Sequence, residues 1–114
     1  MKTTTQVRRF TTAIAFGVAA SSAQFADAAP VKNIVLVHGF FAGGSGWRDV
    51  SGILTRDGHK VSVVQEPETS FGDDVAETTR VLDAQDSPAI LVGHRYGGAV
   101  ITQAGNDEHV LGLL

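Results

Sequence analysis

The stretch Leu91-Val92-Gly93-His94-Arg95-Tyr96-Gly97-Gly98-Ala99 decides the fold of this 114-residue chain. It begins with apolar residues typical of a buried strand and continues into a helix-like segment, with glycines on both sides of Arg95. A strand that turns sharply into a helix forces the residue at the turn into a positive-φ conformation and lifts its side chain above the sheet. Free N–H groups at the start of the helix point to the same place. The stretch therefore predicts a site that stabilises negative charge at position 95.

Apolar residues elsewhere in the chain recur with two different spacings. Continuous apolar runs rich in β-branched residues alternate with segments in which apolar residues recur at helical spacing. The expected strands are residues 33–38, 60–65, 89–92 and 110–114, and the expected helices are residues 47–57, 70–85 and 96–104. This β-α-β-α-β-α-β order predicts an α/β fold with a parallel sheet covered by helices on both faces.

We predict the strand order 2-1-3-4 for this sheet. Such an order places a topological switch between the first and third strands, and ligands of open α/β sheets bind beyond the carboxyl ends of the strands at that point. The glycine-rich loops that follow His38 and His94 would then face each other across one crevice.

The first 28 residues have the features of a secretory signal peptide. Lys2, Arg8 and Arg9 form a basic start, residues 11–22 are small and apolar, and Ala26-Asp27-Ala28 offers a cleavage site. An apolar run of about a dozen residues is shorter than the roughly 20 that span a bilayer. We therefore expect residues 29–114 to be exported, to the periplasm or the extracellular space, without a transmembrane segment.

Charge and cysteine content narrow the classes of partner. The formal net charge is −3, and removal of residues 1–28 would leave 86 residues with a charge of −5. This balance argues against nucleic acid or an anionic membrane surface as a partner. The sequence has no cysteine, so disulfides cannot compensate for the small core of a short exported chain.

Three segments together carry a resemblance to a known family. They are IVLVHGFFAGGSGW at 34–47, SFGDDVAETTRVLD at 70–83 and ILVGHRYGGAVITQAG at 90–105. They resemble the α/β-hydrolase superfamily, and within it the small esterases and lipase-like hydrolases that include plant methylesterases and hydroxynitrile lyases. The resemblance implies ester hydrolysis by Ser-His-Asp acyl transfer, with an ester or carboxylate as the small-molecule partner and no cofactor or metal.

The resemblance also assigns roles to residues around the crevice. His38-Gly39 matches the His-Gly at the end of the family's third strand. Phe40 would then supply one backbone N–H of the oxyanion hole, and Tyr96, directly after the nucleophile position, would supply the other. The remaining residues of the nucleophile elbow motif are Gly93, His94, Gly97 and Gly98.

Arg95 is where the sequence departs from this family. It stands at the nucleophile position, and a guanidinium is always protonated and cannot form an acyl-enzyme. The family's catalytic acid and histidine follow the nucleophile along the chain, beyond strands that come after residue 114. We therefore expect an inactive N-terminal part of a hydrolase.

Two further hypotheses stay open. In the first, Arg95 makes the crevice a binding module that holds a small carboxylate in bidentate fashion. In the second, the chain is a fragment of a longer enzyme completed elsewhere, which would still require another nucleophile. In every case the edge of the fourth strand is open and apolar, which favours self-association.

Other polar residues are expected to have structural roles. We interpret His38 and His94 as parts of their turns and His59 as a helix-end residue. His109 is expected to be solvated. Among the four histidines it is nevertheless the best candidate for a general base. Asp73, Asp74 and Glu77 are expected to stabilise the start of a helix through its dipole rather than to bind a metal ion. Trp47 is expected to lie in the core, and the alternative is that it lines a substrate pocket. Ser45, Ser51, Ser62, Ser70 and Ser87 do not occupy an elbow.

Overall fold

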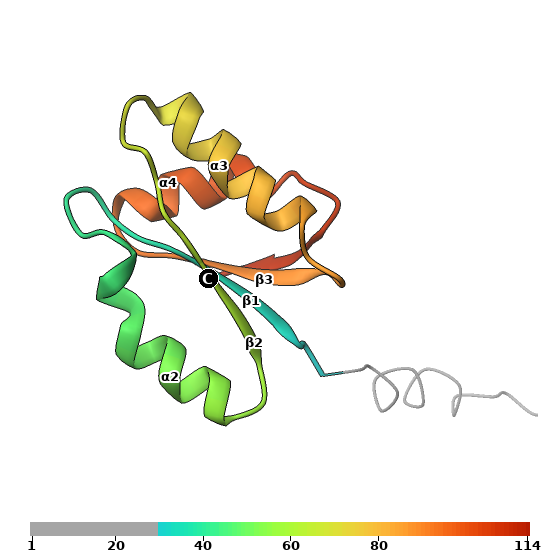
Figure 1. The fold of residues 1–114 in the computed structure, drawn as a ribbon. Coiled ribbons are helices and arrows are strands. Elements are labelled where there is room, and N and C mark those ends of the chain that lie inside the picture. Colours follow the sequence, from blue (N-terminus) through green and yellow to red (C-terminus); the bar gives the residue numbers. More distant parts are fainter. Residues whose placement is uncertain (1–29) are drawn as a thin grey trace, which may run out of the picture.

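A computed structural model describes residues 30–114, which form a four-stranded parallel sheet flanked by helices (Figure 1). The strand order is β2-β1-β3-β4, as predicted. The strands are β1 (Asn33–Val37), β2 (Lys60–Val64), β3 (Ala89–Gly93) and β4 (Val110–Leu113). The predicted signal peptide and its export function lie outside the described residues. Among residues 30–114, no helix is long and apolar enough to cross a membrane.

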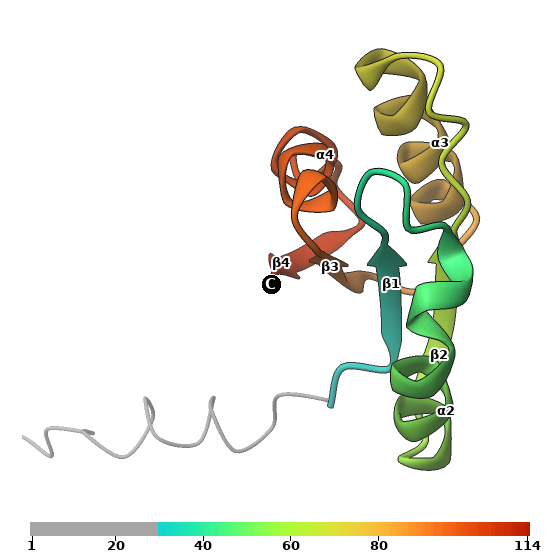
Figure 2. The ribbon, with the colours of Figure 1, turned by 90° about the vertical axis from the view of Figure 1, so that its left-hand side faces the viewer.

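Helices cover both faces of the sheet, and the strand order explains which helix covers which face. The helices are α2 (Arg48–Arg56), α3 (Phe71–Asp83) and α4 (Tyr96–Ala104), with a short 3-10 turn η1 (Gly44–Trp47) before α2. The chain moves one way from β1 to β2 and the opposite way from β2 to β3 and on to β4. Because such crossovers are right-handed, α2 lies on one face while α3 and α4 lie together on the other (Figures 1 and 2).

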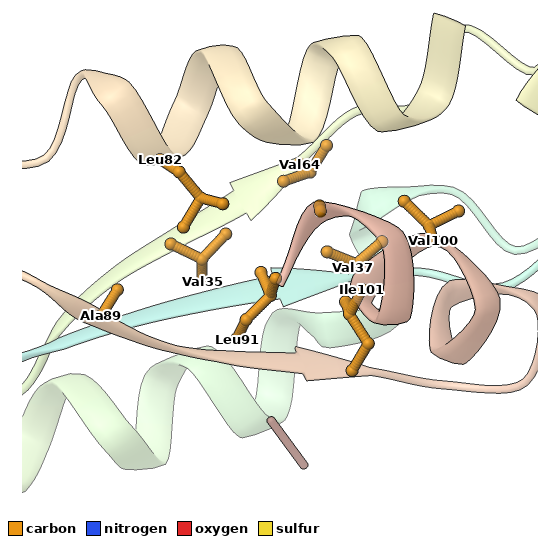
Figure 3. Packing of buried hydrophobic residues seen from close by; sticks show 9 residues of the cluster. Val35, Val37, Val64, Leu82, Ala89, Leu91, Val100 and Ile101 are labelled. Atoms are coloured by element: carbon orange, nitrogen blue, oxygen red, sulfur yellow. The ribbon is translucent and has the colours of Figure 1, made fainter. Parts of the chain in front are cut away.

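The main hydrophobic core lies between the sheet and the α3–α4 layer. Every residue of β1 is buried, as expected for a central parallel strand. In Figure 3, Val35 and Val37 point from β1 toward the helices, with Leu82 of α3 over Val35 and with Val100 and Ile101 of α4 beside Val37. The rest of the core consists of Val64, Ala89, Leu91, Val100, Ile101 and Ala104. Ser70 caps the start of α3, since its hydroxyl accepts a hydrogen bond from the N–H of Asp73 at 3.0 Å.

The opposite face is covered less completely. No residue of α2 is buried, and the side chains of Val50 and Ile53 are 39 % and 51 % exposed. At the sheet edge, β4 pairs only with β3, and Leu111 and Leu113 are exposed. The self-association expected from this edge stays a prediction.

The elbow depends on two glycines that let α4 approach the sheet closely. A Cβ on Gly97 would lie 2.5 Å from the carbonyl oxygen of Val37, and a Cβ on Gly93 would lie 2.5 Å from the carbonyl oxygen of Gly97. Neither distance is compatible with a real side chain. A Cβ on the next residue, Gly98, would meet nothing within 4 Å.

We expect Gly97→Ala to destabilise the protein by about 1–3 kcal/mol, because the methyl group pushes α4 away from β1. Gly98→Ala is the matched control and should stabilise by roughly 0.5–1 kcal/mol, because alanine favours a helix. Urea unfolding followed by the fluorescence of Trp47 measures both. Equal effects of the two substitutions would contradict the close approach.

Candidate functional site

The turn between β3 and α4 holds Arg95 in a strained conformation. Its φ is 54° and its ψ is −117°, and it stands as the N-terminal flanking residue of α4. The His94 N–H donates to the Val37 carbonyl at 3.2 Å, and the Gly98 N–H donates to the Arg95 carbonyl at 2.8 Å. A non-glycine residue held at positive φ costs on the order of 1–3 kcal/mol, which the surrounding structure must supply. Arg95 is exposed above the carboxyl end of the sheet.

The loop after β1 packs directly against this turn. A Cβ on Gly39 would lie 3.0 Å from the His94 carbonyl oxygen and 3.5 Å from Cβ of Arg95. The rings of Phe40 and Tyr96 meet edge to face with their centroids 4.4 Å apart. Within residues 30–114, the backbone N–H groups of Phe40 and Tyr96 donate no hydrogen bond. The side chains of the two residues assigned to the oxyanion hole therefore lie in contact, and neither backbone N–H is used within the described residues.

One curated protein shares sequence with this chain, although no family model matches it. The carbendazim hydrolyzing esterase of Nocardioides sp. (strain SG-4G) is 39 % identical, and the match covers 63 % of this chain and 35 % of that protein.

Solved structures share its fold. The crystal structure of the pyrethroid hydrolase PytH matches with a TM-score of 0.62 and 23 % identity, over 74 % of this chain and 39 % of PytH. Tomato methylketone synthase I matches with a TM-score of 0.56 and 26 % identity, over 68 % of this chain and 35 % of the synthase. Both are α/β-hydrolase fold proteins. This chain has part of the α/β-hydrolase fold. It spans little more than a third of the length of these relatives and corresponds to their N-terminal part.

A buried aspartate ties the hydrolase elbow to the loop after β2. Asp74 is fully buried, and its carboxylate accepts hydrogen bonds from the Tyr96 hydroxyl at 2.6 Å and from the Glu68 N–H at 2.8 Å. Its place in the first turn of α3 suits a carboxylate because the helix dipole is positive there. The hydrogen bond to Asp74 and burial raise the pKa of Tyr96 to about 12. Sequence analysis missed this contact, because it joins residues 22 positions apart.

A second contact joins two further strained residues. Phe41 and Glu68 have φ values of 62° and 54°, and the Phe41 N–H donates to Oε1 of Glu68 at 3.2 Å. With Arg95, all three non-glycine residues at positive φ in the described chain lie in loops that follow β1, β2 and β3. Strain of this kind gathers at functional sites, where the fold holds it in place.

Asp74→Asn should lower the pKa of Tyr96 from about 12 toward the ordinary value near 10, because it removes the negative charge that opposes phenolate formation. Tyr96 is the only tyrosine, so phenolate absorbance during alkaline titration reports on it alone. Asp73→Asn is the control and should leave this titration unchanged. Far-ultraviolet circular dichroism defines the pH range in which the fold persists. A low tyrosine pKa in the unsubstituted protein would contradict the contact.

His38 is buried beneath the crevice and joins the loops after β1 and β2. Its Nε2 accepts a hydrogen bond from the Glu66 N–H at 3.1 Å, so Nδ1 carries the ring proton in the neutral imidazole. Nδ1 lies 2.9 Å from the Gly39 carbonyl oxygen and 3.4 Å from Oε2 of Glu66. His38, Glu66 and Glu68 lie close enough together to hold a metal ion, but both nitrogens of His38 are already engaged. The three residues therefore do not fit a metal site.

Glu66 is a buried acid without a hydrogen-bond partner. Neither carboxylate oxygen accepts a hydrogen bond, and its side chain has no exposed surface. Burial raises its pKa from 4.5 to about 7, and the nearby His38 opposes this rise only partly. The folded protein thus binds a proton at Glu66 more tightly than the unfolded chain does.

We expect stability to fall as pH rises from about 4.5 to about 7, because the unfolded chain releases the Glu66 proton before the folded protein does. The stabilisation that protonated Glu66 contributes is fully present below pH 4.5 and is lost above about pH 7. Glu66→Gln should flatten this dependence and raise stability at pH 8 by on the order of 2 kcal/mol. Urea unfolding at several pH values measures it, with Glu68→Gln as the control. An unchanged slope in Glu66→Gln would contradict a buried carboxylate without a hydrogen bond.

Two sequence-based expectations need correction. His109 is not simply solvated, because its Nδ1 lies 2.7 Å from Asp107 and 3.4 Å from Asp83, and the hydrogen bond to Asp107 raises its pKa. It also lies beside the amino end of β3, where its carbonyl accepts from the Ala89 N–H, so it cannot serve the crevice at the carboxyl end. Trp47 is half-buried outside the main core and lines a cavity beside His94, which was the alternative interpretation.

The remaining candidates have local roles. His94 is exposed, and its ring lies edge to face with that of Trp47, with centroids 6.3 Å apart. Nδ1 of His59 lies 3.0 Å from the Val31 carbonyl oxygen. Asp73 accepts a hydrogen bond from Thr69, and Glu77 pairs with Arg80. Of these contacts, only that of His94 with Trp47 involves the elbow.

Proposed function

We propose that this α/β-hydrolase keeps the binding crevice of an esterase but does not carry out acyl transfer. One observation carries the proposal. Arg95 occupies the strained elbow position, at φ 54°, where an acyl-transfer hydrolase needs its nucleophile. The guanidinium stays protonated and has no lone pair that can attack an ester carbonyl.

No serine in residues 30–114 takes the place of the missing nucleophile. Ser45 lies in η1, Ser51 in α2 and Ser62 in β2, where its hydroxyl accepts from the Gln85 side chain. The Ser70 hydroxyl caps α3, and the Ser87 hydroxyl bonds to Asp86 before β3. None of the five lies in the turn between β3 and α4.

Binding of a small carboxylate is the second candidate function. Within the described residues, the Arg95 guanidinium forms no ion pair or hydrogen bond. The free N–H groups of Phe40 and Tyr96 and the N-terminus of α4 add to the attraction for an anion. The nearby carboxylates of Asp74 and Glu68 are already occupied by hydrogen bonds from Tyr96 and Phe41. Arg95 is therefore available for a bidentate contact with a ligand carboxylate.

One set of variants tests both parts of the proposal. The full chain should not hydrolyse a short-chain chromogenic ester above the buffer rate, and Arg95→Ser should not either, because no base stands beside position 95 in the described chain. Calorimetry should detect saturable acetate binding that weakens by about tenfold or more in Arg95→Ala, since a charge-assisted hydrogen bond is lost. Arg95→Lys should bind with intermediate affinity because it keeps the charge but not the fork.

Arg48→Ala is the matched control, since Arg48 is an exposed arginine on α2. It should leave acetate binding unchanged. Turnover by the unsubstituted chain would overturn the proposal, because it would place a nucleophile elsewhere. Acetate binding that survives Arg95→Ala would remove the second candidate function.

A further inference from the structure

A cavity of about 330 Å³ lies beside the elbow on the side of the crevice that α2 forms. The glycine-rich loop after β1 forms one wall, and Trp47, Val50 and His94 form the others. No acidic, lysine or arginine side chain lines it. A second hollow over α2 differs in this respect, because Arg48, Asp49 and Arg56 line it. The cavity beside the elbow is thus suited to an uncharged, apolar group.

The cavity and Arg95 share a boundary. Gly39 and His94 both line the cavity, and a Cβ on Gly39 would lie 3.5 Å from Cβ of Arg95. A ligand whose carboxylate is held at Arg95 therefore has this cavity as an adjoining hollow for the rest of its structure. The indole of Trp47 forms part of its wall, and an aromatic ring offers a face or edge against which a flat apolar group packs well.

We infer that the ligand of Arg95 is a monocarboxylate with an uncharged, flat apolar body, of the arylalkanoate class, whose body fills the cavity lined by Trp47. The inference rests on the carboxylate binding proposed above. An ammonium group on the body would be desolvated beside Trp47 and Val50 without an acidic partner, so zwitterions are disfavoured. The apolar body adds affinity because the walls remove it from water.

Calorimetry on the full chain with three probes tests this inference. Phenylacetate has the carboxylate and the ring, acetate has only the carboxylate, and phenethyl alcohol has only the ring. We expect phenylacetate to bind at least about tenfold more tightly than acetate and than phenethyl alcohol. Phenylacetate should also change the fluorescence of Trp47, the only tryptophan, whereas acetate should change it much less.

Variants then locate the apolar body. Val50→Phe narrows the cavity and should remove most of the advantage of phenylacetate over acetate. Ile53→Phe adds the same ring one turn along α2, outside this cavity, and should leave the advantage intact. Arg95→Ala should weaken both carboxylates. Since the comparison of probes needs only the unsubstituted chain, the test holds even where a variant fails to fold.

The outcomes separate this inference from the function on which it rests. Equal binding of acetate and phenylacetate would overturn the inference and leave carboxylate binding standing. Failure of both to bind would remove carboxylate binding itself. Phenethyl alcohol that binds as tightly as phenylacetate, without dependence on Arg95, would show that the cavity acts separately from the elbow and would also overturn the inference.

Discussion

The close approach of Gly97 to the carbonyl oxygen of Val37 is the constraint on which the rest of the structure depends. It lets α4 begin directly against the end of β1, so the residue before α4 has no room for an ordinary helical entry and takes a positive φ. The same approach brings the loop after β1 against the turn after β3. Without it, Arg95 and the free amides of Phe40 and Tyr96 would not share a crevice.

Beneath the crevice, a polar network determines how firmly the three loops hold together. Asp74 binds Tyr96 from the elbow and Glu68 from the next loop, and Glu68 in turn binds Phe41. Glu66 lies buried nearby with its pKa raised to about 7. The carboxylates of this network are thus either hydrogen-bonded or prone to hold a proton, and within the described residues none of them pairs with Arg95.

The two faces of the sheet have different tasks. The face under α3 and α4 contains the main core and supplies most of the apolar burial that stabilises the fold. The face under α2 is looser, since α2 buries none of its residues, and it is here that the cavity beside the elbow lies. Separation of this kind is common, because binding regions sit where packing is least complete while a rigid layer positions them.

The sequence by itself determined the order of the elements and the elbow around Arg95, because hydrophobic period and glycine spacing act over short stretches of chain. The strand order 2-1-3-4 was predicted as one choice, and the structure confirms it. The sequence also indicated the superfamily from motifs at two strand ends. Only the tertiary structure decided that Asp74 holds Tyr96, that Glu66 is buried without a partner, that Trp47 faces a cavity and that His109 lies at the opposite end of the sheet. These features depend on which side chains of distant loops meet when parallel strands pair, and no local pattern in the chain records that.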